Sequence, residues 1–198
     1  MKQLISVIMI IQFLIYFGFS MIIPVIPELV NQLGVSTLHM GLLLAIYSLA
    51  SFLSAPFFGR LSDKIGRRPL LIGGLSTFAL SFLIFGLFID NLPILYISRI
   101  IGGAASGALY TATTSMVADI TTREERTKYM GLVGMCIGFG FIFGPGVGGL
   151  LAGISLSFAY YMTTVVILGA LVFSLIKVPE TYKRQTNVAP KKIGLTID

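Results

Sequence analysis

Asp63 stands among four basic residues in the segment 59–69, which reads Gly-Arg-Leu-Ser-Asp-Lys-Ile-Gly-Arg-Arg-Pro. A carboxylate this close to several cations can form ion pairs with them. Gly59 and Gly66 near the two ends permit tight turning and close approach of the backbone. The segment is therefore a candidate functional charge cluster, although the same charges could do no more than orient the flanking helices.

Arg99 is the one charged residue well inside a long apolar stretch. On insertion scales such a residue costs at least about 2.5 kcal/mol unless it faces a polar interior. At about 100° per residue, one helix face would carry Tyr96, Arg99, Gly103, Ser106, Tyr110 and Thr113. We therefore expect Arg99 to point inward, beside polar neighbours and with access to water. In the alternative interpretation it extends to the nearby headgroup layer.

Glycine and proline are concentrated in the segment 129–151. Small residues let membrane helices approach closely, and one stripe is expected to carry Gly134, Gly138, Pro145, Gly148 and Gly149. Pro145 also removes a backbone hydrogen bond, so we expect a bend there. Close packing against a neighbouring helix is the simplest role for this segment.

The elements that must position these residues are apolar and long. Hydrophobic residues make up 56% of the chain and charged residues 11%, against about 25% charge in ordinary soluble domains. A membrane helix needs about 20 apolar residues, and six segments qualify: 4–27, 38–58, 69–89, 93–118, 129–151 and 157–176. The sequence predicts an all-α integral membrane protein with a six-helix transmembrane domain over 1–176 and a polar cytoplasmic tail over 177–198.

Basic residues predict which way this bundle faces. Thirteen of the fourteen Lys and Arg residues, all except Arg99, lie at the amino terminus, in the two connections after the second and fourth segments, or in the tail. The alternate connections contain none. Because basic flanks are retained on the cytoplasmic side, we expect both termini to be cytoplasmic.

The sequence gives little support for a nucleic-acid-binding protein, a disulfide-rich or metal-binding protein, or an enzyme. The net charge of +6 does not indicate nucleic-acid binding, because no basic soluble domain is present. Cys136 is the single cysteine, so neither a disulfide framework nor a cysteine-based metal site is expected. We predict no enzyme, no metal and no cofactor, because the sequence presents no nucleophile–base pair and no ligand cluster.

The segment 59–69 closely resembles the signature loop of the major facilitator superfamily. The resemblance implies one half of that family's fold, a six-helix bundle of 3+3 inverted repeats, with this loop acting as a cytoplasmic gate latch between two halves. Asp63 would engage a helix N-terminus of the other half. Arg67, with Arg60 as a further candidate, would pair with acidic groups such as Asp119. The implied gate residues are Gly59, Arg60, Asp63, Gly66, Arg67, Arg68 and Asp119.

Two further motifs resemble those of proton-coupled exporters. The pattern Leu95-x-x-x-Arg99-x-x-Gly102-Gly103 is similar to the fourth-helix motif of proton-coupled members and implies a role for Arg99 in proton coupling. The segment 140–149 is similar to the glycine–proline motif of the drug:proton antiporter branch, carried here by Gly140, Gly144, Pro145, Gly148 and Gly149. Together they favour multidrug efflux over uptake.

In this family the first, second, fourth and fifth helices line a central cavity. Helix phase then nominates Gln12, Tyr16, Phe19, Tyr47, Ser51, Tyr110 and Phe141 as lining residues. Such a lining suits amphipathic cations, although aromatic residues at helical spacing can equally well simply pack.

The resulting hypothesis is a transporter half in the cell membrane that uses protons to export a small-molecule substrate. No Asp or Glu lies deep within a predicted span, so the proton carrier is expected on a second six-helix half. Two alternatives remain open: a half of a proton-coupled sugar or metabolite uptake carrier, and a non-transporting membrane fragment that regulates a full-length partner.

Overall fold

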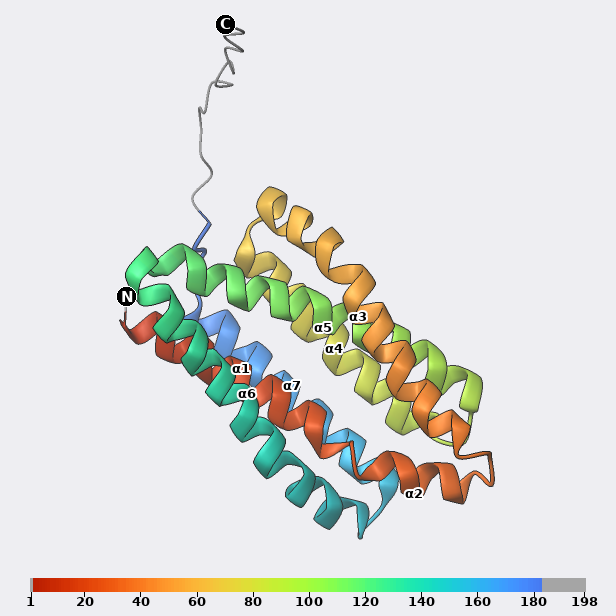
Figure 1. Ribbon diagram of the computed structural model, residues 1–198. Helices are drawn as coiled ribbons and strands as arrows, with labels where there is room; N and C mark the ends of the chain where they lie inside the picture. Colours follow the sequence, from red (N-terminus) through yellow and green to blue (C-terminus); the bar gives the residue numbers. More distant parts are fainter. Residues whose placement is uncertain (1, 183–198) are drawn as a thin grey trace, which may run out of the picture.

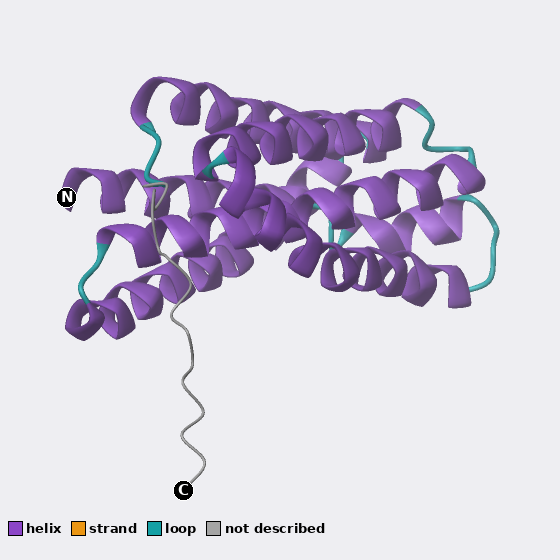
Figure 2. Ribbon diagram, turned by 90° about the horizontal axis from the view of Figure 1, so that it is seen from above, coloured by secondary structure: helices purple, strands orange, loops and turns teal. Residues whose placement is uncertain are grey.

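The computed structural model describes residues 2–182, which form seven α-helices and contain no strand (Figures 1 and 2). The helices are α1 (Lys2–Met21), α2 (Val25–Gln32), α3 (Leu38–Ile65), α4 (Arg67–Leu87), α5 (Leu92–Ile120), α6 (Arg123–Ala152) and α7 (Leu156–Lys177). With α1 and α2 counted together, six stretches are long and apolar enough to cross a membrane. The predicted fold class is confirmed, while most of the predicted tail, residues 183–198, lies outside the described residues.

The first span is broken near its C-terminal end. Pro24 has no backbone N–H and its ring excludes the carbonyl of the preceding turn, so α1 ends at Met21 and α2 begins at Val25. Pro27 is tolerated because it lies in the first turn of α2, where N–H groups lack helical partners. Pro56 and Pro145 are different, because α3 and α6 continue through them as α-helix.

The packing of the helices follows an inverted repeat (Figure 1). The second and third spans, α3 and α4, both pack on α5 and contact each other little. The fifth and sixth spans, α6 and α7, pack in the same way on α1, and α4 meets α7. Each set of three spans therefore packs two helices on the first helix of the other set. Because a repeat of three spans reverses direction across the membrane, this is the arrangement expected for a 3+3 inverted repeat.

Small residues bring the central helices into contact with their neighbours. A Cβ at Gly103 of α5 would meet the Tyr47 backbone of α3, and one at Gly107 would lie 2.6 Å from the Ser51 carbonyl oxygen. Glycine at these positions therefore allows the backbones of α3 and α5 to approach closely.

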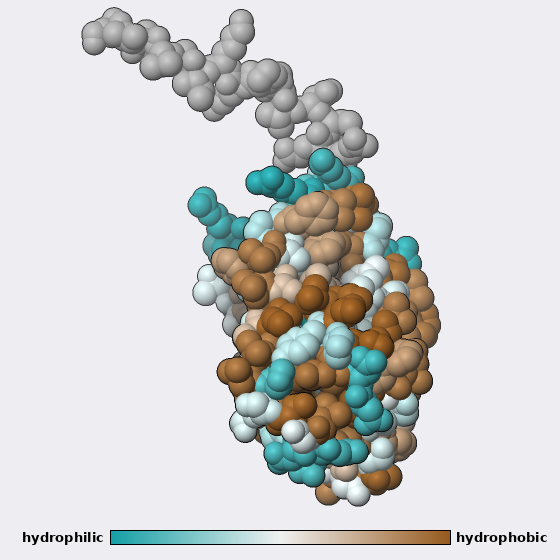
Figure 3. All heavy atoms as spheres, turned by 90° about the vertical axis from the view of Figure 1, so that its right-hand side faces the viewer, coloured by the Kyte–Doolittle hydropathy of each residue, from teal (hydrophilic) through white to brown (hydrophobic). Residues whose placement is uncertain are grey.

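The core lies between α4, α5, α7 and α1, while α3 and α6 are peripheral. The rings of Phe78, Phe82 and Phe85 on α4 and of Tyr160 on α7 are fully buried. By contrast, Phe52 on α3 is 75% exposed and Leu150 on α6 is 79% exposed. Apolar side chains cover much of the surface seen in Figure 3. Such a surface is expected where a protein contacts lipid or an apolar partner.

Candidate functional site

The charge cluster after the second span sits on two helices joined by one glycine. Helix α3 extends to Ile65, beyond the predicted end at 58, so Asp63 is helical. Gly66 alone separates α3 from α4 and has φ +100°, a left-handed conformation that favours glycine. This tight reversal brings the end of α3 against the start of α4.

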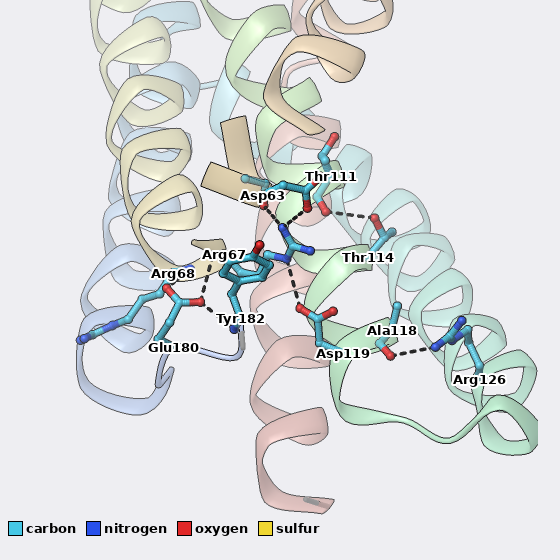
Figure 4. Close-up of polar contacts among 11 residues, drawn as sticks. Asp63, Arg67, Arg68, Thr111, Thr114, Ala118, Asp119, Arg126, Glu180 and Tyr182 are labelled. Carbon is cyan, nitrogen blue, oxygen red and sulfur yellow. Dashed lines mark hydrogen bonds and ion pairs between the residues drawn. The ribbon is translucent and has the colours of Figure 1, made fainter. Parts of the chain in front are cut away.

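Arg67 is the centre of the cluster (Figure 4). Its Nη1 donates to Asp63 Oδ1 at 2.6 Å and to Ser62 Oγ at 3.1 Å, and its Nε donates to Asp119 Oδ2 at 3.1 Å. Arg67 is 8% exposed. The predicted partner, Asp119 at the end of α5, is thus in place, and one guanidinium links three helices.

The carboxylates of Asp63 and Asp119 differ in how much of their surface is exposed. The side chain of Asp63 is 63% exposed, whereas that of Asp119 is 28% exposed. The Asp63–Arg67 pair is therefore strongly screened and contributes about 0–1 kcal/mol to stability. Asp63 keeps most of its acceptor surface available to another group.

The other expected members of the gate motif contribute less. Arg60 is exposed on α3, and no ion pair is formed by it within residues 2–182. Arg68 turns away from the carboxylates and donates from Nη2 to the Leu175 carbonyl at 2.9 Å. A Cβ at Gly59 would meet only ordinary contact distance, 3.8 Å from Thr111, so close backbone approach does not explain that glycine.

Two residues beyond the last span belong to the cluster and were missed by sequence reasoning. Glu180 accepts the backbone N–H groups of Arg67 at 3.0 Å and Arg68 at 3.2 Å. The ring of Tyr182 lies under the Arg67 guanidinium, with 4.6 Å between Cζ and the ring centroid. A useful sequence signal was available, because Glu180 is one of only two acidic residues among the five basic residues of the segment 177–198.

Arg99 does not occupy the polar, water-accessible position that was expected. It is 2% exposed and lies against Phe85 of α4 and Tyr160 of α7, with its Cζ 4.4 Å and 5.9 Å from their ring centroids. The two rings stack at 4.2 Å. The inward orientation agrees with the expectation, but the expected water access and the headgroup alternative are both wrong for this structure, because the buried side chain lies against rings of α4 and α7 in the core.

Aromatic rings take the place of a counter-ion around this guanidinium. A desolvated cation over a ring gains about 2 kcal/mol or more. Arg99 Nη2 also donates to the Tyr160 hydroxyl at 3.4 Å, while Nε is buried without a hydrogen-bond partner among the described atoms. The expected polar neighbour Tyr96 bonds instead to His39 Nδ1 at 2.8 Å.

Four of the seven expected cavity residues form one aromatic cluster. Centroid distances are 5.8 Å for Tyr16–Phe141, 6.1 Å for Phe19–Phe141 and 4.8 Å for Phe19–Tyr47. The cluster joins α1, α3 and α6, and it is open on one side because Phe141 is 40% exposed. Helix phase therefore grouped these rings correctly.

The other three cavity candidates differ in their surroundings, and Tyr110 lies close enough to Tyr16 of that cluster to interact with it electrostatically. Gln12 is 1% exposed, and both of its side-chain polar atoms lack a described partner. Ser51 lies in the close contact between α3 and α5. Tyr110 on α5 is 51% exposed. Gln12 is thus enclosed between helices and does not line an open surface.

The glycine motif of α6 divides between two faces. A Cβ at Gly140 or Gly144 would meet the backbone of Phe17, and one at Gly148 would overlap Met21. Ser20 Oγ also donates to the Gly140 carbonyl at 2.7 Å. Five glycines on α6 instead have no described neighbour within 4 Å: Gly131, Gly134, Gly138, Gly146 and Gly149. The expected stripe was wrong in placing Gly148 with Gly134, Gly138 and Gly149.

Comparison with known proteins agrees with this architecture. Residues 8–196 match the family model of the Major Facilitator Superfamily. The crystal structure of the human organic anion transporter MFSD10 (TETRAN) superposes with a TM-score of 0.80 at 24% identity, covering 92% of this chain and 49% of that one. This likeness concerns the fold alone.

Two bacterial relatives are more similar in sequence. Multidrug resistance protein 2 of Bacillus subtilis (strain 168) is 40% identical over 85% of this chain and 42% of its own length. Quinolone resistance protein NorA of Staphylococcus aureus (strain N315) is 33% identical over 88% of this chain and 45% of its own length. The chain thus spans less than half the length of these relatives. With six membrane-spanning stretches in an inverted repeat, the chain belongs to the Major Facilitator Superfamily of membrane transporters.

Proposed function

We propose that this chain is the amino-terminal half of a proton-coupled efflux transporter that exports amphipathic drugs or other small molecules by alternating access. The observation that carries the proposal is the 40% identity to Multidrug resistance protein 2 over 85% of the chain. The geometry supports it through the ion-paired cluster between α3 and α4 and through the close packing of the α6 glycines on α1.

The Arg67 cluster is proposed to act as a cytoplasmic latch. Arg67 holds Asp63 and Asp119 together, while the exposed side of Asp63 is available to the positive N-terminus of a helix. In this mechanism, a helix of the second half docks there when the cytoplasmic side closes.

A second six-helix half is the proposed partner. Helices α3 and α6 bury the smallest share of their residues among the six spans. Their exposed apolar side chains and the open glycines of α6 provide surfaces on which helices of that half can pack closely. A half-length match to relatives supports the same interpretation.

Substrate and protons would meet between the halves. The open aromatic cluster of α1, α3 and α6 supplies apolar contact and cation–π attraction for a substrate. Arg99 is proposed to contribute to proton coupling as a fixed buried cation. Because the carboxylates of residues 2–182 lie towards the helix ends or in connections, the group that binds the proton would come from the second half.

The proposed location is the cell membrane, with both termini on the cytoplasmic side. The Arg67 cluster, the α5–α6 connection and the start of the tail lie at one end of the bundle and carry the basic residues. Positively charged flanks are retained on the cytoplasmic face. Lipid therefore surrounds the outward faces of the bundle.

The test measures transport by the complete assembly that contains this chain. Inverted membrane vesicles with an acidic interior should accumulate a fluorescent lipophilic cation, and a protonophore should abolish accumulation. Arg99→Ala should remove at least about nine-tenths of the rate, since it removes the buried charge proposed to act in coupling. Arg123→Ala, an exposed cytoplasmic arginine, is the matched control. Accumulation that ignores the proton gradient, or metabolite uptake by whole cells, would contradict the proposal.

A further inference from the structure

The N-terminus of α4 is an unusual place for two arginines. Arg67 and Arg68 occupy its first turn, where the helix dipole already presents partial positive charge. The preceding Gly66 has no side chain with which to cap the exposed N–H groups. This helix start therefore needs a negative group from elsewhere in the chain.

Glu180 supplies that group from the segment that follows α7. Its two carboxylate oxygens accept the Arg67 and Arg68 N–H groups at 3.0 Å and 3.2 Å. Oε1 also accepts the N–H of Tyr182 at 2.9 Å, which holds the segment in a turn. A carboxylate on two terminal amides is a charge-assisted helix cap.

Gly66 makes this docking possible. A Cβ at this position would overlap the Glu180 carboxylate, with Cδ at 2.9 Å. The absence of a side chain therefore serves two purposes, since Gly66 also adopts φ +100°. The connection between α3 and α4 is shaped to receive the tail segment.

Tyr182 completes the arrangement by covering Arg67 from the tail side. Its ring centroid lies 4.6 Å from Cζ of the guanidinium, within the range of a cation–π contact. Figure 4 shows Arg67 enclosed by Asp63, Asp119 and Tyr182, with Glu180 beneath the start of α4. The backbone and the side chain of Arg67 are thus both held by the same short segment.

We propose that the segment Val178–Tyr182 positions Arg67 in the latch, with Glu180 and Tyr182 as positioning residues. This inference rests on the proposed latch function of Arg67. Because the segment leads out of the last span, displacement of the tail would release the α4 N-terminus and the arginine together. Glu180 fixes the backbone, and Tyr182 limits the directions in which the guanidinium can move.

Amide hydrogen exchange on the complete assembly tests the positioning directly. Glu180→Ala should speed exchange of the Arg67 and Arg68 amides about tenfold or more, as expected for loss of a hydrogen bond to a charged group. Glu180→Gln, which keeps one acceptor oxygen, should give a smaller increase. Glu124→Gln, an exposed carboxylate on α6, removes the same charge from the cytoplasmic face and should leave this exchange unchanged.

The role of the Tyr182 ring is tested separately, by labelling of a cysteine introduced next to the latch. In a Cys136→Ser background with Lys64→Cys as reporter, Tyr182→Leu should increase cytoplasmic labelling two- to fivefold, by our order-of-magnitude estimate for losing one cation–π contact. Tyr182→Phe keeps the ring and should match the parent. Equal labelling of the Leu and Phe variants would refute the role of Tyr182, and unchanged Arg67 and Arg68 exchange in Glu180→Ala would refute that of Glu180.

Transport by the unaltered assembly distinguishes failure of the proposed efflux function from failure of the positioning role of Glu180. If it exports no lipophilic cation, the proposed function fails, while exchange and labelling still decide whether the tail positions Arg67. If it exports normally and Glu180→Ala lowers the transport rate at least threefold without changing the amount of protein in the membrane, the positioning role is supported. A transport rate equal to that of Glu124→Gln would overturn it.

Discussion

Gly144 and Gly146 on α6 form a matched pair for substitution by alanine, because the added methyl group would be crowded at Gly144 and unobstructed at Gly146. An alanine Cβ at Gly144 would lie 2.7 Å from the Phe17 carbonyl oxygen and would overlap Ser20 Oγ on α1. At Gly146 no described atom lies within 4 Å of the added Cβ. We predict that Gly144→Ala separates α1 from α6, whereas Gly146→Ala leaves their contact intact.

The size of the difference follows from the contacts. Forcing a methyl group into a packed interface costs about 1–3 kcal/mol. Displacing Ser20 also forfeits its 2.7 Å hydrogen bond to the Gly140 carbonyl, which contributes about 0.5–1.5 kcal/mol. Alanine gains about 0.5–1 kcal/mol over glycine in a helix, but this gain applies to both variants and cancels. The two variants should therefore differ by about 1.5–4.5 kcal/mol in the free energy of unfolding.

Thermal unfolding in detergent measures that difference on the isolated chain. At about 2–4 °C per kcal/mol for a chain of this size, Gly144→Ala should unfold roughly 3–18 °C below Gly146→Ala. Reaction of the half-buried Cys136 on α6 with a fluorogenic maleimide provides a second probe of unfolding. Equal unfolding temperatures for the two variants would refute the assigned packing of α6 on α1.

Three further predictions concern polar and aromatic contacts. Asp63→Asn should change the free energy of unfolding by less than about 1 kcal/mol, because the pair is exposed, yet raise cytoplasmic labelling of the complete transporter; unchanged labelling would contradict the latch. Phe85→Leu should lower the unfolding temperature more than Tyr160→Phe, because it removes the ring nearest Arg99 while the Phe variant keeps its ring; the reverse order would contradict the cation–π assignment. Ser20→Ala should cost about 0.5–1.5 kcal/mol in chemical unfolding, and no cost would show that its bond to Gly140 contributes nothing.

Much of the fold could be predicted because it depends on the hydropathy and charge of consecutive residues. The six spans are runs of apolar residues, and the proposed sidedness rests on the positions of lysines and arginines. The Arg67–Asp119 pair was predicted from the family resemblance, because Asp119 ends α5 on the side of the bundle where α4 begins at Arg67. The helix ends were less accurate, since polar residues such as Asp63 extend α3 beyond the apolar segment that marks it.

The surroundings of Arg99 show where this reasoning fails. Helix phase predicted a polar face of α5 around Arg99, but it could not say which helices the arginine meets. The structure directs the guanidinium to Phe85 and Tyr160, which lie on two other helices. Aromatic rings can hold a buried cation, so the assumption that Arg99 required water or a polar interior was too narrow.

By itself, the sequence determined the number of spans and the chemistry available in the signature segment, because hydropathy and charge are properties of consecutive residues. Tertiary structure alone decided which glycines of α6 meet α1, which rings enclose Arg99 and how Glu180 reaches α4. These outcomes depend on the rotation of each helix and, for Gly140 and Glu180, on partners more than a hundred positions away. Packing of the whole bundle selects among the faces that each helix offers.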